Sequence, residues 1–149
     1  MKRRRDRESG VTVVEFVVLT PILFFLMFGS VDIGLALFAR HVAVSAAQEG
    51  ARVAREDAAD PNADWQTSST DAANNWVMSL LGDLVVSPPD TSMARSYATV
   101  PLDQPYPQVG VTVNFGIVSL MPGLNFTESA SSVGPVECFY TLAGVCDGE

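Results

Sequence analysis

The fold of this chain is decided at residues 9–16, Ser9-Gly10-Val11-Thr12-Val13-Val14-Glu15-Phe16, where a basic leader meets a long apolar segment. From Val11 to Ala39 the only charged residues are Glu15 and Asp32. Phe16 to Val31 carries no charge and extends over about 24 Å as an α-helix, against a hydrocarbon core of about 30 Å. Continuing the helix to Ala39 supplies the missing length, so residues 11–39 are predicted to span a membrane.

Two residues inside this segment need an explanation in a membrane. Asp32 lies close to the outer end, where we expect its carboxylate to reach water; at the bilayer centre it would cost about 2.5–3.5 kcal/mol. Pro21 would cost about 3 kcal/mol inside a soluble helix. Membrane helices tolerate proline because hydroxyls such as that of Thr20 can bond the freed carbonyl. We therefore predict a bend at Pro21 and assign it no function.

The charge distribution predicts the orientation of the chain. Residues 1–10 have a net charge of +3 and residues 40–149 a net charge of −9, within a total of −8. Basic residues next to a membrane segment remain in the cytoplasm. We therefore expect a basic cytoplasmic leader (1–10), a transmembrane helix (11–39) and an extracytoplasmic domain (40–149). An acidic outer domain also argues against nucleic acid as a partner, because phosphate binding requires basic surface.

A cleaved signal peptide is the main rival to a membrane anchor. It would have the same basic start and apolar core, with a possible cut after Ala36 and the small residue Gly34 two positions earlier. Three features disfavour it: the uncharged core is long, Glu15 interrupts its start, and the helical pattern continues past Ala39 without a boundary. We retain the anchor as the preferred interpretation.

Gly10 and Glu15 form the most informative pair at the front of the helix. A glycine lets a protease approach the backbone closely in an extended conformation. Cleavage after Gly10 would leave an α-amino group on Val11, with an ordinary pKa of about 7.7–8.0. Glu15, one helical turn further on, could pair with this amine or with that of a neighbouring subunit. The alternative is that Glu15 reaches the cytoplasmic headgroups and that Gly10 is a flexible joint.

Residues 9–55 resemble the TadE-like family of minor pilins (pseudopilins) of the tight-adherence Flp pilus system. The resemblance rests on residues 9–16, then on Leu19-Thr20-Pro21, on Val31-Asp32-Ile33-Gly34, and on Ala46-Ala47-Gln48-Glu49-Gly50-Ala51-Arg52. The family's glycine falls on Gly10, its glutamate on Glu15, its aromatic residue on Phe16 and its E-G-A-R sequence on Glu49 to Arg52. Family members usually have an aromatic residue where this chain has Ile33. A fainter match covers Val109 to Glu137.

The resemblance implies a processing site at Gly10 and Val11, cut by a prepilin peptidase, with Glu15 and Phe16 setting the helix register in a filament. It implies a non-enzymatic role in pilus assembly and cell adhesion at the cell membrane. The expected partners are membrane lipid, other pilins, pilus-assembly proteins and the peptidase. No cofactor, small-molecule substrate or nucleic acid is implied.

The outer portion predicts an α+β fold of pilin-like type. From Arg40 to Asp57 small apolar residues recur at spacings of three and four, so the membrane helix is expected to continue as an amphipathic helix over about 11–57. A second helix is predicted from Thr70-Asp71 to Gly82. Its apolar side is expected to hold Trp76, Val77, Leu80 and Leu81, with both Trp65 and Trp76 packed rather than exposed for binding.

Several short β-strands are predicted after this helix. The candidates are Leu84–Val86, Tyr97–Leu102, Val109–Ile117, Phe126–Val133 and an edge strand over Val136–Cys146. Pro88-Pro89-Asp90 separates the first two. The clean alternation of Val109–Ile117 is the strongest of these signals. We expect a small antiparallel sheet packed on the long helix.

Residues suited to chemistry are few. Cys138 and Cys146 are predicted to form a disulfide outside the cytoplasm, the alternative being two free buried thiols. His41 has no nucleophilic partner in a suitable pattern and is expected to be a solvated interfacial residue. The sequon at Asn125 is given little weight. No catalytic residue and no metal site is predicted.

Two functions are therefore compared. The preferred one is a minor pilin whose helix, after cleavage at Gly10, packs into or under a filament. The alternative is an uncleaved single-pass surface protein that presents an acidic binding domain. A tethered enzyme has no residues to support it.

Overall fold

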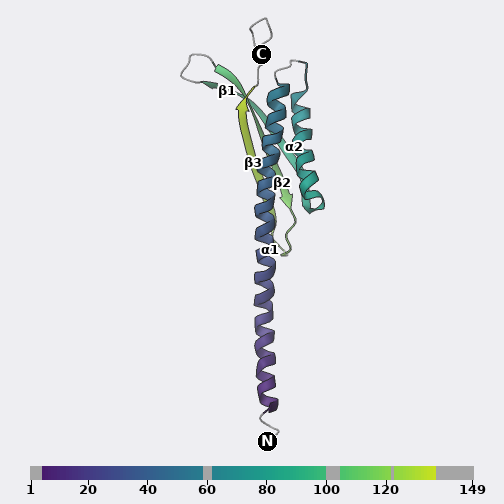
Figure 1. Cartoon of the computed structure of the whole chain (residues 1–149), viewed down its shortest axis with the longest axis vertical. Coiled ribbons are helices and arrows are strands. Elements are labelled where there is room, and N and C mark those ends of the chain that lie inside the picture. Colours follow the sequence, from purple (N-terminus) through teal and green to yellow (C-terminus); the bar gives the residue numbers. More distant parts are fainter. Residues whose placement is uncertain (1–4, 59–61, 100–104, 122, 137–149) are drawn as a thin grey trace.

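A computed structural model describes residues 5–58, 62–99, 105–121 and 123–136 (Figure 1). Within these residues the chain forms two α-helices, a short 3-10 helix (η1) and three β-strands. In chain order they are α1 (Arg5–Asp57), α2 (Trp65–Leu81), η1 (Gly82–Leu84), β1 (Val85–Thr99), β2 (Pro105–Ile117) and β3 (Phe126–Pro135). This is the predicted α+β fold of pilin-like type, with a long N-terminal helix packed on a small antiparallel sheet.

Helix α1 dominates the shape of the molecule. Its 53 residues extend over about 80 Å at about 1.5 Å per residue. The sheet and α2 gather around its C-terminal half, and the N-terminal half projects alone (Figure 1). The helix ends at Asp57 as predicted but begins at Arg5, six residues earlier than the predicted start at Val11. The backbone at Gly10 is therefore helical, not extended.

The sheet is antiparallel with strand order β1-β2-β3. The central strand, β2, shows the predicted alternation. Every second side chain along it is buried, and these side chains all lie on the same face of the sheet. These residues are Val109, Val111, Val113, Phe115 and Ile117. Helix α1 covers β2 and β3, and α2 lies against β1. Both helices thus pack on the same apolar face of the sheet.

Strand β1 differs from the prediction of two strands separated by Pro88-Pro89-Asp90. It is one strand of 15 residues, with register shifts between Val85 and Ser87 and again between Ser87 and Asp90. Prolines are tolerated because β1 is an edge strand, where an absent N–H costs no ladder bond. At the bulge the Ser87 hydroxyl accepts the Gly116 N–H at 2.9 Å, replacing a backbone acceptor.

Helix α2 begins at Trp65, five residues before the predicted start. Asp64 caps it, since its carboxylate accepts the Thr67 N–H at 3.2 Å and the Thr67 hydroxyl at 2.6 Å. These bonds lower the pKa of Asp64, with the Thr67 hydroxyl as the largest cause. An N-cap carboxylate satisfies donors that the first turn leaves free. Gly82 ends the helix as predicted, with a φ of 48°.

The buried side of α2 is only partly the predicted one. Val77 and Leu81 are buried, and Trp65 packs against the core. Trp76 and Leu80 are 42% and 48% exposed, so their prediction as packing residues was wrong. The other buried positions are Ser69 and Ala73, small residues that allow α1 to approach closely. The apolar stripe of α2 therefore follows the spacing of four, 69-73-77-81.

The core lies where the C-terminal half of α1 meets α2 and the sheet. Almost all of the α1 residues in it are alanines, so the helix axis comes close to both partners. They are Ala39, Val42, Ala43, Ala46, Ala47, Ala51 and Ala54. A Cβ added at Gly50 would lie 3.1 Å from three atoms: Ala73 Cβ, the Ser69 carbonyl oxygen and Val111 Cγ1. Gly50 is thus a point of closest approach of α1 to both neighbours.

Three sequence predictions extend beyond the described residues. The predicted Cys138–Cys146 disulfide lies outside them. Of the predicted edge strand Val136–Cys146, only Val136 is described. Of the predicted strand Tyr97–Leu102, only the residues up to Thr99 are described. Val136 itself packs against the core.

Replacing Gly50 with valine is expected to destabilise the domain by about 1–3 kcal/mol, as overpacked cores typically are. The matched control is Gly34→Val in the same helix, where an added Cβ meets nothing within 4 Å. Thermal unfolding of the detergent-solubilised protein, followed by circular dichroism, measures both variants. Equal unfolding midpoints for the two would contradict the close approach at Gly50.

Candidate functional site

The N-terminal half of α1 is bare within the described structure. From Val13 to Val31 every residue is exposed except Thr20 and Gly29, which are half-buried. The segment is long and apolar enough to cross a membrane. It extends over roughly 28 Å at about 1.5 Å per residue, close to the hydrocarbon thickness of about 30 Å.

The polar side chains of this bare segment bond within the helix. The Thr20 hydroxyl donates to the Phe16 carbonyl at 2.6 Å, and the Ser30 hydroxyl donates to the Met27 carbonyl at 2.8 Å. The proline leaves the Val17 carbonyl without its helical donor, so Thr20 bonds a different carbonyl from the one we expected. Internal bonding of hydroxyls suits a lipid environment, which offers no donors or acceptors.

The predicted processing and register residues all lie in α1. Gly10 and Val11 are in its helical backbone, and Glu15 follows one turn after Val11. Glu15 and Phe16 are both exposed, with Phe16 at 69%. Neither is covered by another described element, so both are available to a neighbouring molecule.

Asp32 is the residue whose environment differs most from the prediction. It was expected to face water at the outer interface, but only 2% of it is exposed. Its Oδ1 accepts the Leu120 N–H at 2.9 Å. Its Oδ2 accepts the Met121 N–H at 3.2 Å and lies 2.9 Å from the Ser119 hydroxyl. The carboxylate therefore holds the loop between β2 and β3 against α1.

This contact, which we call the aspartate clamp (Asp32 with Ser119–Met121), explains why a carboxylate is tolerated there. A buried carboxylate is costly unless donors surround it, and bonds to an ionised acceptor are the stronger ones. Here two backbone N–H groups and a hydroxyl surround it. The sequence offered one hint, an aspartate within an apolar run, but nothing in it identified the loop 88 residues away.

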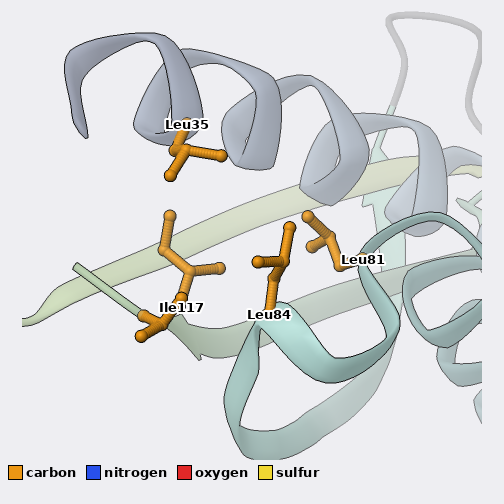
Figure 2. A pocket seen from close by; sticks show the side chains of 5 residues that line it. Leu35, Leu81, Leu84 and Ile117 are labelled. Carbon is orange, nitrogen blue, oxygen red and sulfur yellow. The ribbon is translucent and has the colours of Figure 1, made fainter. Parts of the chain in front are cut away.

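Just beyond the clamp, an apolar junction closes the base of the domain. Figure 2 shows Leu35 of α1 facing Leu81, Leu84 and Ile117. Leu35 lies three residues after Asp32, one turn further into the domain. Coverage of α1 thus begins at Asp32 on one face only, because Ile33, Leu37 and Phe38 remain 63%, 57% and 46% exposed.

The sequence Glu49-Gly50-Ala51-Arg52 has a structural explanation. The Arg52 guanidinium bonds Glu49 at 2.6 Å and Glu56 at 2.8 Å. The bond from Arg52 lowers the pKa of Glu49, and the two carboxylates raise the pKa of Arg52. Such exposed pairs contribute little to stability, because water screens the charges. Gly50 and Ala51 face the core, so the four residues combine a packed side with a charged, solvated side.

The remaining candidates show no chemical grouping. His41 is exposed, as predicted from its sequence context, and Asn125 is exposed as well. Within the described ranges no cluster of three or more histidine, cysteine, aspartate or glutamate residues could hold a metal ion. An open hollow on the outer side of α1 is lined by seven residues: Ser45, Gln48, Glu49, Arg52, Arg55, Trp76 and Ser132.

Comparison with known protein families gives a match that lies within helix α1. Residues 10–52 match the family model described as TadE-like protein. This segment is similar to TadE-like proteins. The resemblance expected from the sequence is thereby confirmed for α1. No match was found among curated proteins, and none among solved structures.

The TadE-like segment contains the bare helix, Glu15, Asp32 and the sequence from Glu49 to Arg52. The other half of the aspartate clamp, Ser119 to Met121, lies outside the matched residues, as does the fainter resemblance at Val109–Glu137. The family match therefore covers α1 but not the β2–β3 loop, and the structure shows that α1 binds this loop through Asp32.

Replacing Asp32 with leucine is expected to release the β2–β3 loop. The Leu120 N–H would lose its acceptor, at a cost of about 1–3 kcal/mol for an unsatisfied group. The Met121 N–H would keep only the Ser119 hydroxyl oxygen, 3.0 Å away. Hydrogen exchange by mass spectrometry should show faster exchange of these amides in the detergent-solubilised protein. Ser119→Ala removes the hydroxyl that donates to Asp32 and accepts from Met121, but it leaves the carboxylate as an acceptor for both amides and should have a smaller effect. Unchanged exchange in the Asp32 variant would show that the loop is held by other contacts.

Proposed function

We propose that this chain is a non-enzymatic, membrane-anchored minor pilin (pseudopilin) that acts in the assembly of a tight-adherence type pilus. The observation that carries the proposal is the bare apolar half of α1, Val13–Val31, within a segment that matches the TadE-like family. Its length suits a single crossing of a bilayer. Exposed apolar residues continue past Val31 at Ile33, Leu37 and Phe38, although Asp32 and Ala39 are buried under the domain, so the proposed span remains residues 11–39.

The charges support an orientation with the N-terminus in the cytoplasm and the domain outside. The leader, residues 1–10, carries a net charge of +3, and residues 40–149 carry −9. Positively charged flanks are retained on the cytoplasmic side.

The fold also disfavours removal of the helix as a signal peptide. A cut after Ala36 would separate Asp32 and Leu35 from the domain that they hold. The loop from Ser119 to Met121 would lose its acceptor, and the apolar junction would lose one wall. The rest of the domain depends on the helix staying attached.

The proposed processing step is cleavage after Gly10 by a prepilin peptidase. It would free the amine of Val11 one helical turn before Glu15, about 6 Å along the axis. Glu15 is exposed and lies on the uncovered part of α1. Its carboxylate would pair with this amine or with that of an adjacent subunit, setting the axial register of packed helices.

Cleavage predicts that the native, membrane-extracted protein has lost Met1 to Gly10. Intact-mass spectrometry measures this directly. Gly10→Val is expected to block the loss, because a branched side chain prevents close approach of the protease to the backbone. Gly29→Val in the bare helix, where a Cβ would meet nothing, is the control and should be cut normally. A full-length native chain favours the uncleaved alternative.

The register role predicts that Glu15→Gln keeps membrane insertion but impairs pilus assembly. Removing a charge pair worth about 1.4 kcal/mol lowers an association constant about tenfold. Glu8→Gln is the matched control, because Glu8 is removed with the leader. Pilus number per cell, counted by electron microscopy, compares the two variants. Normal piliation with Glu15→Gln would remove the register role.

The alternative function is an uncleaved surface protein that presents its acidic domain to a ligand. One observation favours it: the exposed Trp76 lines the open hollow beside Arg52 and Arg55. An exposed tryptophan next to cations is typical of binding surfaces. A native chain that retains Met1 to Gly10 would support this function over the pilin.

A further inference from the structure

The loop between β2 and β3 lies at the base of the domain, next to the point where α1 becomes bare (Figure 1). The aspartate clamp fixes it there through Leu120 and Met121. Three of its side chains are nevertheless turned outward, since Val118, Leu120 and Leu124 are 38%, 51% and 48% exposed. The loop is thus held by its backbone while its apolar side chains face away from the domain.

We propose that the described residues of this loop, 118–121 and 123–125, form a second membrane contact that inserts Val118, Leu120 and Leu124 into the outer leaflet of the bilayer. The inference rests on the proposed membrane anchoring of α1. Under that anchoring the contact is adjacent to an apolar surface already in lipid, because Asp32, which holds the loop, lies between the exposed residues Val31 and Ile33. Transfer of these side chains from water into hydrocarbon is favourable.

The charge pattern of the chain supports lipid as the occupant. Residues 40–149 carry a net charge of −9, yet no charged residue occurs from Gln104 to Thr127. An anionic leaflet would repel an acidic surface. The β2–β3 loop is therefore uncharged, and the exposed Asp83 of η1 is the acidic residue next to it in the proposed surface. Leu84, which is 37% exposed beside the apolar junction, extends the same surface on the side of η1.

The clamp also explains how the loop would enter the interface without exposing polar backbone. The N–H groups of Leu120 and Met121 both bond Asp32, so they need no water. Unsatisfied backbone groups are what excludes irregular loops from apolar surroundings. A buried carboxylate that supplies acceptors to the loop removes part of that cost.

Tryptophan fluorescence in nanodiscs tests the proposal with the full chain. In a Trp65→Phe, Trp76→Phe background, Leu120→Trp places a single reporter on the loop. The lipid is phosphatidylcholine brominated near the glycerol end of the acyl chains, which quenches only tryptophans at that depth. The expected result is blue-shifted emission and loss of most of the fluorescence. Leu124→Trp is a second reporter should Leu120→Trp not fold, as judged by circular dichroism.

Two further single reporters make the outcomes distinct. Val133→Trp is the matched control, being 62% exposed on β3 away from the base, and should not be quenched. Phe25→Trp reports on the bare helix. Because Phe25 lies about 9 Å deeper than Val31, this reporter is measured in phosphatidylcholine brominated near the methyl ends of the acyl chains, where it should be quenched. Quenching at Phe25→Trp without quenching at Leu120→Trp would overturn the loop contact while leaving the anchor intact. Blue-shifted but unquenched emission at Leu120→Trp would mean burial by protein and would also overturn it. Absence of quenching at Phe25→Trp would overturn both.

Discussion

The close approach of α1 to its neighbours is the constraint on which the rest of the structure depends. Alanines and Gly50 give the C-terminal half of the helix almost no side-chain bulk. The apolar face of β2 and the short stripe of α2 can therefore reach the α1 backbone. The N-terminal half has the opposite character, with large aliphatic and phenylalanine side chains that no described element covers. One continuous helix thus carries two surfaces, one shaped for protein and one for lipid.

Asp32 marks the boundary between these two surfaces. A carboxylate in an apolar helix would be unfavourable in either environment, yet here it is surrounded by two backbone N–H groups and a hydroxyl from a distant loop. Loss of those donors would leave a buried charge, and loss of the carboxylate would leave buried amides. Each side needs the other, which fixes the depth at which the sheet sits along the helix. The apolar contact of Leu35 with Leu81, Leu84 and Ile117 strengthens the same boundary.

Periodicity predicted much of the fold, because the spacing of small residues in α1 and the alternation of β2 are local signals. It failed where a distant partner decided the outcome. Trp76 seemed a core residue by size, but close helix packing selected Ser69 and Ala73 instead. The prolines of β1 looked like a break, but an edge strand absorbs them as bulges. The role of Asp32 required the loop from the other end of the chain, which no local pattern identifies. Gly10 and Glu15, by contrast, were singled out from local sequence alone, and their proposed roles rest on it.

Helix α1 passes from its bare half to its covered half without a break. No flexible linker intervenes, so the domain has no freedom to swivel about its stem. A pull along the helix axis would be transmitted to the sheet as through a stiff rod. The stem and the domain would therefore move as one body, and lifting the subunit out of lipid would raise the β2–β3 loop by the same distance and at the same moment.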